Sequence, residues 1–221
     1  MCWLVLTILF IIIVPLVRLA YVLFTIHIGI SSVHKGPVHP VHTAVIIGSG
    51  GHTTEMLRLV KNINFVNYSP RTYIMASTDT TSEVKIRELE IEKTDPHREK
   101  LNESFEIITI PRSRHVGQSY ITSVFTTLYS LIFSFPLMFY KRPKLILCNG
   151  PGTCIPICAV AFIMRLLCMT ETKIVFVESI CRVKSLSLSG KILLLFADEI
   201  LVQWPELQKT YTRTKFIGRL V

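Results

Sequence analysis

A glycine-rich loop offers the clearest chemistry in this sequence. Residues 48–55 read GSGGHTTE and follow an apolar, β-branched run that starts at residue 42. Glycines let the backbone turn tightly and approach a ligand, and the amides at the start of a following helix face an anion. A purely structural turn between a strand and a helix is the alternative. The residues that we expect to bind an anion here are Gly48, Ser49, Gly50, Gly51 and Thr53.

A second loop of the same kind lies at residues 148–153, which read CNGPGT. It follows the apolar run KLIL and also opens on a helical pattern. Two anion-friendly turns at one edge of a sheet suggest a phosphate or diphosphate ligand. The residues that we expect to take part are Asn149, Gly150, Gly152 and Thr153.

Two further loops carry charged side chains. Glu178 follows the apolar run KIVFV, and its carboxylate could bind sugar hydroxyls or position a proton, so it is a candidate catalytic residue. It could equally pair with Arg182, because ion pairing also holds acidic groups at strand ends. Residues 111–115, PRSRH, form a basic cluster that suits an anion or is simply a solvated loop.

The loops match the common nucleotide-binding motifs poorly. The first loop contains G-x-G, but Thr53 stands where the dinucleotide fingerprint has a third small residue. Asp79, after the second expected strand, could act as the acid that binds a ribose. Gly190-Lys191 is followed by Ile192 and lacks the upstream glycine of a P-loop.

The elements that position these loops alternate along the chain. Apolar runs typical of strands are separated in most places by helical patterns, such as the charged segment 82–93. This alternation predicts an α/β fold with a parallel sheet covered on both faces, and ligands bind at the carboxyl ends of such strands. The expected strands span residues 42–48, 71–77, 105–111, 144–150, 173–179, 199–204 and 215–221.

The amino terminus reads as a membrane anchor. Residues 2–17 contain no charge, and after Arg18 the apolar character continues to Ile30. This length spans a hydrocarbon core of about 30 Å if Arg18 snorkels or the helix extends past it. We therefore expect an uncleaved transmembrane anchor at 1–30, a linker at 31–41 and one domain at 42–221. Basic residues follow the anchor, which places the domain in the cytosol and leaves the sequons at Asn67 and Asn102 unmodified.

Composition excludes several classes of function. The formal charge of +9 is spread along 221 residues with no base-stacking module, which disfavours nucleic-acid binding. The six cysteines form no CxxC pair and lie mostly in apolar runs, which is typical of reduced, buried thiols and not of a zinc site. Residues 116–140 carry no charged side chain and are read as a helix on the sheet whose outer face dips into the membrane interface, with plain core packing as the alternative.

Five motifs in order carry a family resemblance: IGSGGH at 47–52, LCNGPGT at 147–153, VESICR at 177–182, SGK at 189–191 and VQWP at 202–205. Together they resemble the membrane-anchor subunits of the UDP-N-acetylglucosamine transferase of dolichol-linked oligosaccharide synthesis. The match covers nearly the whole chain after residue 42. The chain is also similar to the amino-terminal, acceptor-binding half of the bacterial lipid-linked muramyl-pentapeptide glucosaminyltransferase, a two-domain GT-B enzyme.

The resemblance implies a Rossmann-like parallel sheet that forms one half of a GT-B glycosyltransferase, with an N-terminal transmembrane helix. It implies a split, inverting enzyme: this chain binds the lipid-linked diphosphate acceptor, a soluble catalytic subunit binds UDP-GlcNAc, and the chain alone is inactive. The reaction adds the second GlcNAc to GlcNAc-diphosphate-dolichol at the cytosolic face of the endoplasmic reticulum membrane. No cofactor or metal is expected, since the sequence has no Asp-x-Asp to hold a metal on the diphosphate.

Such a reaction needs a base that activates the acceptor hydroxyl. His52 is the candidate, because a neutral imidazole titrates near physiological pH and its loop borders the expected diphosphate site. In the bacterial relatives a histidine ends the corresponding glycine loop, so the resemblance carries the role to His52 by motif position. A structural or acceptor-binding role for His52 is the alternative.

The soluble partner is expected to dock near the last strand, because no second α/β lobe follows it. The residues that we expect to contact the partner are Phe216, Ile217, Gly218, Arg219, Leu220 and Val221. Two other classes of function stay open at this point. One is a membrane-tethered oxidoreductase that binds a dinucleotide at the glycine turn, and the other is a structural receptor that recruits a partner without touching substrate.

Overall fold

A single parallel sheet organises the domain. The structure is a computed structural model and describes residues 2–29, 40–93, 104–114, 117–150 and 152–220. In this part of the chain seven strands pair in the order β3-β2-β1-β4-β5-β6-β7, all parallel, which confirms the predicted α/β sheet. The strands are β1 (Thr43–Ile46), β2 (Arg71–Ala76), β3 (Phe105–Ile110), β4 (Leu145–Asn149), β5 (Lys173–Val177), β6 (Glu199–Val202) and β7 (Thr214–Phe216).

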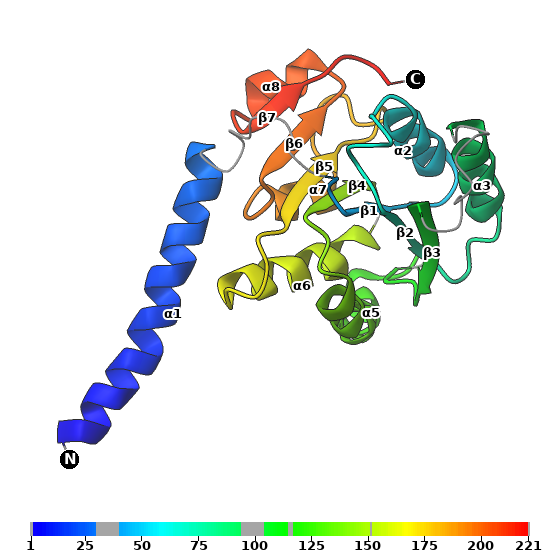
Figure 1. Cartoon of the computed structure of the whole chain (residues 1–221). Coiled ribbons are helices and arrows are strands. Elements are labelled where there is room, and N and C mark those ends of the chain that lie inside the picture. The colour runs from blue at the N-terminus through cyan, green and yellow to red at the C-terminus, as the bar shows by residue number, and fades with distance from the viewer. Residues whose placement is uncertain (1, 30–39, 94–103, 115–116, 151, 221) are drawn as a thin grey trace.

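Helices cover the sheet on both faces. The chain runs outward from β1 to β3, returns to β4 and then runs outward in the opposite direction, so right-handed crossovers place the two sets of helices on opposite faces. Helices α2 and α3 cover one face and α5 to α8 the other, and Figure 1 shows α2 and α3 above and α5 and α6 below the sheet. The bounds are α2 (Gly51–Lys61), α3 (Thr81–Lys93), α5 (Tyr120–Lys141), α6 (Cys154–Leu166), α7 (Leu188–Leu193) and α8 (Pro205–Thr210).

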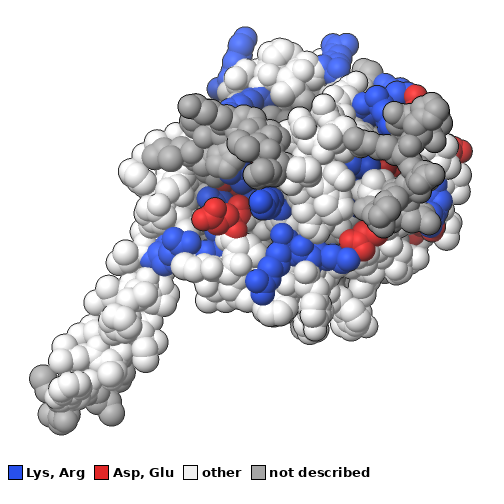
Figure 2. All heavy atoms as spheres, viewed as in Figure 1, with Lys and Arg blue, Asp and Glu red and all other residues white. Residues whose placement is uncertain are grey.

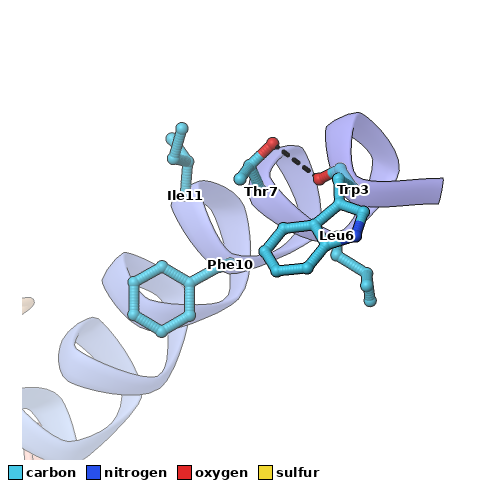
Figure 3. Close-up of a pocket in the computed structure, with 5 residues that line it drawn as sticks. All are labelled: Trp3, Leu6, Thr7, Phe10 and Ile11. Atoms are coloured by element: carbon cyan, nitrogen blue, oxygen red, sulfur yellow. Dashed lines mark hydrogen bonds between the residues drawn. The ribbon is translucent and has the colours of Figure 1, made fainter. Parts of the chain in front are cut away.

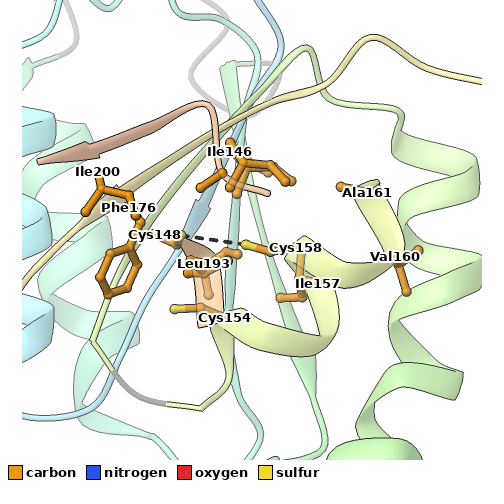
Figure 4. Close-up of a cluster of buried hydrophobic side chains, with 14 of the residues drawn as sticks. Ile146, Cys148, Cys154, Ile157, Cys158, Val160, Ala161, Phe176, Leu193 and Ile200 are labelled. Carbon is orange, nitrogen blue, oxygen red and sulfur yellow. Dashed lines mark hydrogen bonds between the residues drawn. The ribbon is translucent and has the colours of Figure 1, made fainter. Parts of the chain in front are cut away.

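Each face of the sheet has its own core. Val45 points to the core beneath α2 and α3, whereas its neighbour Ile46 points to the larger core beneath α5 and α6. This alternation explains why the strands are apolar along their whole length. Figure 4 shows part of the larger core, where the thiols of Cys148 and Cys158 lie 3.7 Å apart.

The cysteine prediction holds for the thiols of this core. Cys148, Cys154 and Cys158 are free and buried, as the apolar runs around them indicate. Burial raises the pKa of the Cys148 thiol well above its usual value, so it stays protonated and unreactive. Cys168 and Cys181 are free but exposed, because each lies in a turn outside the packed elements.

A buried ion pair fixes α3 to β2. Arg71 donates through Nε and Nη2 to the two carboxylate oxygens of Glu90, both at 2.7 Å, and the Tyr73 hydroxyl donates to Glu90 at 2.6 Å. Arg71 and Glu90 are both buried, so these bonds replace the water that each charge gives up. The pair thus joins the start of β2 to the last turns of α3.

Helix α1 (Cys2–Ile28) leaves the domain on the side of α5 and α6 (Figure 1). Val22 and Ile26 are buried at its domain end, and Arg18 donates to the carbonyl of Arg165 in α6. The described side chains before Arg18 are exposed, and, as Figure 2 shows, the projecting part of the helix carries no charge. By length and hydropathy two segments among the described residues could cross a membrane, Leu9–Ile28 and Ile121–Lys141.

A shallow hollow of about 310 Å³ lies on the far end of α1 (Figure 3). Its lining side chains, Trp3, Leu6, Thr7, Phe10 and Ile11, all project from this one helix. The Thr7 hydroxyl donates to the Trp3 carbonyl, so even this polar group is satisfied within the helix. Such a surface suits an apolar surrounding.

Several strands are shorter than expected, and those expected at 42–48, 173–179 and 199–204 end at Ile46, Val177 and Val202. The last strand, expected at 215–221, is Thr214–Phe216, because β6 ends at Val202 and offers one further carbonyl, to the amide of Ile217, before Gly218 turns the chain at φ 80°. The uncharged segment 116–140 forms α5 from Tyr120, and it lies on the sheet as predicted. Residues 30–39 of the expected linker lie outside the described residues.

Candidate functional site

The two glycine loops meet where the strand order reverses. Strands β1 and β4 are neighbours, but the helices that follow them cover opposite faces, so the loops after these strands diverge. In open α/β sheets this arrangement creates the crevice in which ligands bind. The sheet therefore brings together the loops at 48–52 and 149–153, as the sequence predicts.

A hydrogen-bonded chain of side chains joins these loops. His52 Nδ1 lies 2.9 Å from Asn149 Oδ1, and Asn149 Nδ2 donates to Glu55 Oε2 at 2.8 Å. Asn149 and Glu55 are buried, whereas the His52 side chain keeps 33% of its surface exposed. The imidazole is thus bonded to the protein through Nδ1 and keeps part of its surface open to solvent.

Glu55 also holds the loop that follows β5. Its Oε1 accepts from the Ser179 hydroxyl at 3.0 Å and from the Ile180 amide at 3.2 Å. Glu55 is not among the site residues predicted from the sequence, because nothing in its own neighbourhood distinguishes it from an ordinary helical glutamate. The only local signal is its spacing of three residues from His52, which places both on one face of the first turn of α2.

Interactions within this cluster shift the pKa values of His52 and Glu55. The side-chain interaction with Glu55, whose Oε2 lies 3.9 Å from His52 Nδ1, raises the pKa of His52 above its usual value despite the opposing effect of burial. For Glu55 burial favours the neutral acid, but interactions with His52, Asn149 and the Ile180 amide outweigh it and lower the pKa. Glu55 is therefore a carboxylate at neutral pH.

Gly150 lies against the imidazole ring of His52. Its φ is 79°, and a Cβ added there would lie 2.5 Å from His52 Nδ1. Both the left-handed backbone and the missing side chain are thus required at this position. The second glycine loop positions His52 by shape as well as by the Asn149 bond.

The first glycine loop leaves the start of α2 uncapped. Gly50 occupies the N-cap position with φ 68°, and no side chain in the described part of the chain caps the amides of the first turn. Thr53, expected to bind the anion, instead donates its hydroxyl to the Gly48 carbonyl, and its Oγ1 lies 2.7 Å from Ser82 Oγ. Its side chain shapes the loop, while the amides of the turn, which no described side chain caps, are available to a ligand.

The basic cluster after β3 borders both glycine loops. Arg112 Nη2 donates to Ser49 Oγ at 2.8 Å, and its Nη1 lies 3.4 Å from the Thr78 hydroxyl. Arg114 lies beside the second glycine loop, because a Cβ added to Gly152 would be 3.6 Å from the Cβ of Arg114. The cluster is therefore part of the site and not a distant solvated loop, although its last member, His115, lies outside the described residues.

Glu178, the second catalytic candidate, is buried away from solvent. Its carboxylate accepts from the Ser179 amide at 3.0 Å and from the amide and hydroxyl of Ser187 at 2.8 and 2.9 Å. Burial raises its pKa. Within the described residues no hydrogen bond or close ion pair joins it to the exposed Arg182, whose positive charge still favours the ionised carboxylate. Through its bonds to Ser179 and Ser187, Glu178 fixes both ends of the loop formed by residues 179–187.

Three other residues considered from the sequence have side chains that are bonded or buried within the protein. Both ends of the Asn149 amide are bonded within the chain, so only its main chain can reach a ligand. The Thr153 side chain is buried beside the start of α6. Asp79, considered as a ribose acid, accepts from the amide and hydroxyl of Ser82 at 3.1 and 2.6 Å and thereby caps α3. Among the described residues no three metal-binding side chains lie together.

The carboxyl-terminal segment crosses the sheet edge toward α2. The Leu220 amide donates to Gln203 Oε1 at 2.9 Å, and Arg219 stacks on the Trp204 ring at 4.4 Å. Trp204 in turn donates to the Ile180 carbonyl at 2.6 Å. Phe216 and Ile217 remain exposed at 44% and 39%, and Val221 lies outside the described residues.

Comparisons with known proteins place this chain in a family. The family described as "Oligosaccharide biosynthesis protein Alg14 like" matches residues 43–220. The human "UDP-N-acetylglucosamine transferase subunit ALG14" is 44% identical over 201 residues, which cover 91% of this chain and 93% of that protein. The rat protein of the same name is 49% identical over 177 residues, or 80% and 82% of the two chains.

A solved structure supports the fold. MurG from Acinetobacter baumannii superimposes with a TM-score of 0.52 at 16% identity, over 76% of this chain and 43% of that chain. This chain thus corresponds to less than half of the MurG chain, in keeping with one Rossmann-like half of a GT-B glycosyltransferase. With residues 43–220 matched and close similarity along nearly the whole human protein, the chain belongs to the Alg14 family.

Proposed function

We propose that this chain is the membrane-anchored, acceptor-binding subunit of an inverting UDP-GlcNAc transferase. In this proposal it binds GlcNAc-diphosphate-dolichol at the cytosolic face of the endoplasmic reticulum and recruits a soluble subunit that binds UDP-GlcNAc. The family name supports the reaction, and the human and rat relatives are named as subunits. The fold supports the division, because it corresponds to one half of a GT-B enzyme.

The acceptor diphosphate binds at the start of α2. The observation that carries this assignment is the first turn of α2, whose amides are capped by no side chain among the residues that the structure describes, while Arg112 lies bonded to Ser49 beside them. Main-chain amides at a helix start and a guanidinium are both strong partners of phosphate oxygens. The residues that contribute main chain or hydroxyl groups are Gly48, Ser49, Gly50, Gly51, Gly150 and Gly152.

His52 acts as the general base. Its neutral imidazole accepts the proton of the attacking acceptor hydroxyl as that oxygen bonds to the anomeric carbon of the donor sugar and UDP leaves with the bonding electrons. The proton ends on His52, and UDP carries away the negative charge. The diphosphate site and the base lie on one loop, so binding the acceptor places its sugar near the imidazole.

Two apolar surfaces orient the subunit on the membrane. Helix α1 spans the bilayer, and the exposed outer face of α5 rests in the interface on the same side of the sheet. Residues 42–221 then form the cytosolic domain. Lys141 ends α5, Arg142 and Lys144 follow it, and these three basic residues favour an anionic membrane surface.

Replacing His52 by alanine tests the proposal. Removal of a general base lowers turnover by about 10² to 10⁴-fold, so sugar transfer by the assembled complex should fall by this factor while the complex still assembles. The matched control is His42→Gln, which removes a half-buried histidine that bonds Thr72 at the other end of the sheet. Unchanged turnover of His52→Ala would end its candidacy.

A further inference from the structure

We propose that Glu55 is a positioning residue that decides, through Asn149, which nitrogen of His52 carries the proton. This inference rests on the proposed role of His52 as the base. It concerns a residue that touches neither substrate nor the reacting atoms. Its basis is the direction of the hydrogen bonds that join the three side chains.

The first step is that Glu55 can only accept hydrogen bonds. Both of its oxygens are used, Oε2 by Asn149 and Oε1 by the Ser179 hydroxyl and the Ile180 amide. An ionised carboxylate has no proton to donate, so the group that faces Oε2 must be a donor. Asn149 must therefore turn its NH₂ group toward Glu55.

The second step follows from the planar amide of Asn149. With its NH₂ group directed at Glu55, its carbonyl oxygen necessarily faces His52, at 2.9 Å from Nδ1. An oxygen that only accepts requires a proton on Nδ1. In the neutral imidazole the lone pair then lies on Nε2, which is the nitrogen that remains to take a proton from the acceptor hydroxyl.

The surroundings of His52 keep this arrangement in place. Gly150 packs against the ring so closely that a Cβ there would overlap Nδ1. The charged groups that act on the imidazole are Glu55 on its own helix and, at longer range, Glu178 after β5. Across the site, the loop after β3 contributes Arg112, bonded to Ser49, and Arg114, bonded to the Gln118 carbonyl.

Glu55→Gln separates this role from simple packing. A glutamine of nearly equal shape can accept at only one end, so it cannot satisfy the Ile180 amide and Asn149 Nδ2 together. If its oxygen accepts from Ile180, its NH₂ group faces Asn149, whose amide must reverse and offer NH₂ to His52. The proton of the neutral imidazole then moves to Nε2, and the lone pair faces inward.

The tautomer is measured directly by ¹⁵N NMR of the imidazole in the full chain with its partner, with His52→Gln used to assign the signals. The wild-type protein should show a protonated Nδ1, and a protonated Nε2 there overturns the inference without any variant. Glu55→Gln should lose the Nδ1-protonated form. An unchanged tautomer in this variant also overturns the inference.

Kinetics give a second readout. The neutral imidazole is the active form, and Glu55 raises its pKa. Turnover should therefore fall on the acid side with an apparent pKa above the usual value for histidine. Glu55→Gln should lower kcat at least tenfold, leave KM for the acceptor within about twofold, and move the acid limb to lower pH. A rise in KM with unchanged kcat and pH profile contradicts a positioning role.

The two proposals fail in distinguishable ways. Full activity of His52→Ala removes the base and with it the proposed mechanism, whatever the tautomer is. An inactive His52→Ala with an unchanged tautomer in Glu55→Gln removes only the role of Glu55. Glu83→Gln, which breaks an exposed pair with Arg87 on α3, is the matched control and should leave the tautomer and kinetics unchanged.

Discussion

At the scale of single residues, the site depends on contacts that leave no room for another atom. Gly150 combines a left-handed backbone with direct contact to the His52 ring. Gly190 is similar, because a Cβ there would lie 2.5 Å from Glu178 Oε2. At each glycine a neighbouring side chain, His52 or Glu178, occupies the space that a Cβ would need. Their requirement is steric and not merely conformational.

Gly150→Ala should disable the site more than its backbone strain explains. The new Cβ must displace the imidazole, and displacement of a catalytic group by about 1 Å costs about a hundredfold in rate. We expect at least this loss of transfer activity in the assembled complex. The control is Gly117→Ala, because Gly117 has nearly the same φ of 77° but nothing within 4 Å. Equal losses in both variants would show that strain alone is responsible.

At the scale of elements, α5 has two different faces. Met138, Ser130 and Ser134 are buried toward the domain, whereas Phe125 and Ile132 are exposed at 70% and 66%. The segment between α5 and β4 is basic, and the lower surface of Figure 2, over α5, is largely without charge. An uncharged face of this size on a soluble domain usually marks a contact with another molecule or with lipid.

Replacing Phe125 and Ile132 together by serine tests the membrane contact. Burial of each such side chain contributes about 2 kcal/mol, so their loss should reduce transfer to a dolichol-linked acceptor in vesicles at least tenfold. Transfer to a short-chain, water-soluble acceptor should not change. The control replaces Val84 and Ile91 on α3, which are exposed on the opposite face of the sheet. Equal loss with both acceptors would indicate a packing defect instead.

At the scale of the whole molecule, the carboxyl-terminal segment links the proposed partner surface to the site. Arg219 stacks on Trp204, Trp204 bonds to the Ile180 carbonyl, and the Ile180 amide bonds to Glu55. The segment also reaches α2, where Arg58 Nη1 lies 3.5 Å from the Leu220 carbonyl. A subunit that docks on this segment would therefore rest directly above the loops that hold His52.

Deletion of residues 216–221 should abolish co-purification of the soluble subunit from detergent extracts. Because the deletion also removes the bond between Leu220 and Gln203, the milder variant Phe216→Ser with Ile217→Ser is needed beside it. It exposes no new backbone and should weaken association at least tenfold, since it removes two exposed apolar side chains. The α5 variant above is the control, and undiminished association of both carboxyl-terminal variants would refute the docking site.

Much of the architecture follows from local pattern. Alternation of apolar strands and helices predicts the parallel sheet, because each strand must bury both faces, as Val45 and Ile46 do. The uncharged run after Cys2 predicts a long apolar helix, and the glycines at 48–51 and 150–152 predict two turns at one sheet edge. These properties depend on neighbouring residues, so a single sequence contains them.

Only the tertiary structure shows which side chains of the site bond to one another. Asn149 and Glu55 lie 94 residues apart, and Ser179 is 124 residues from Glu55, so no local pattern could pair them. Glu178 looked catalytic because it follows a strand, but its burial and its bonds to Ser187 became visible only when the loop was placed. Thr53 likewise turned inward to Gly48 and Ser82. Chain direction determines which residues reach an edge of a sheet, whereas hydrogen-bond geometry between distant segments determines which of them face a ligand.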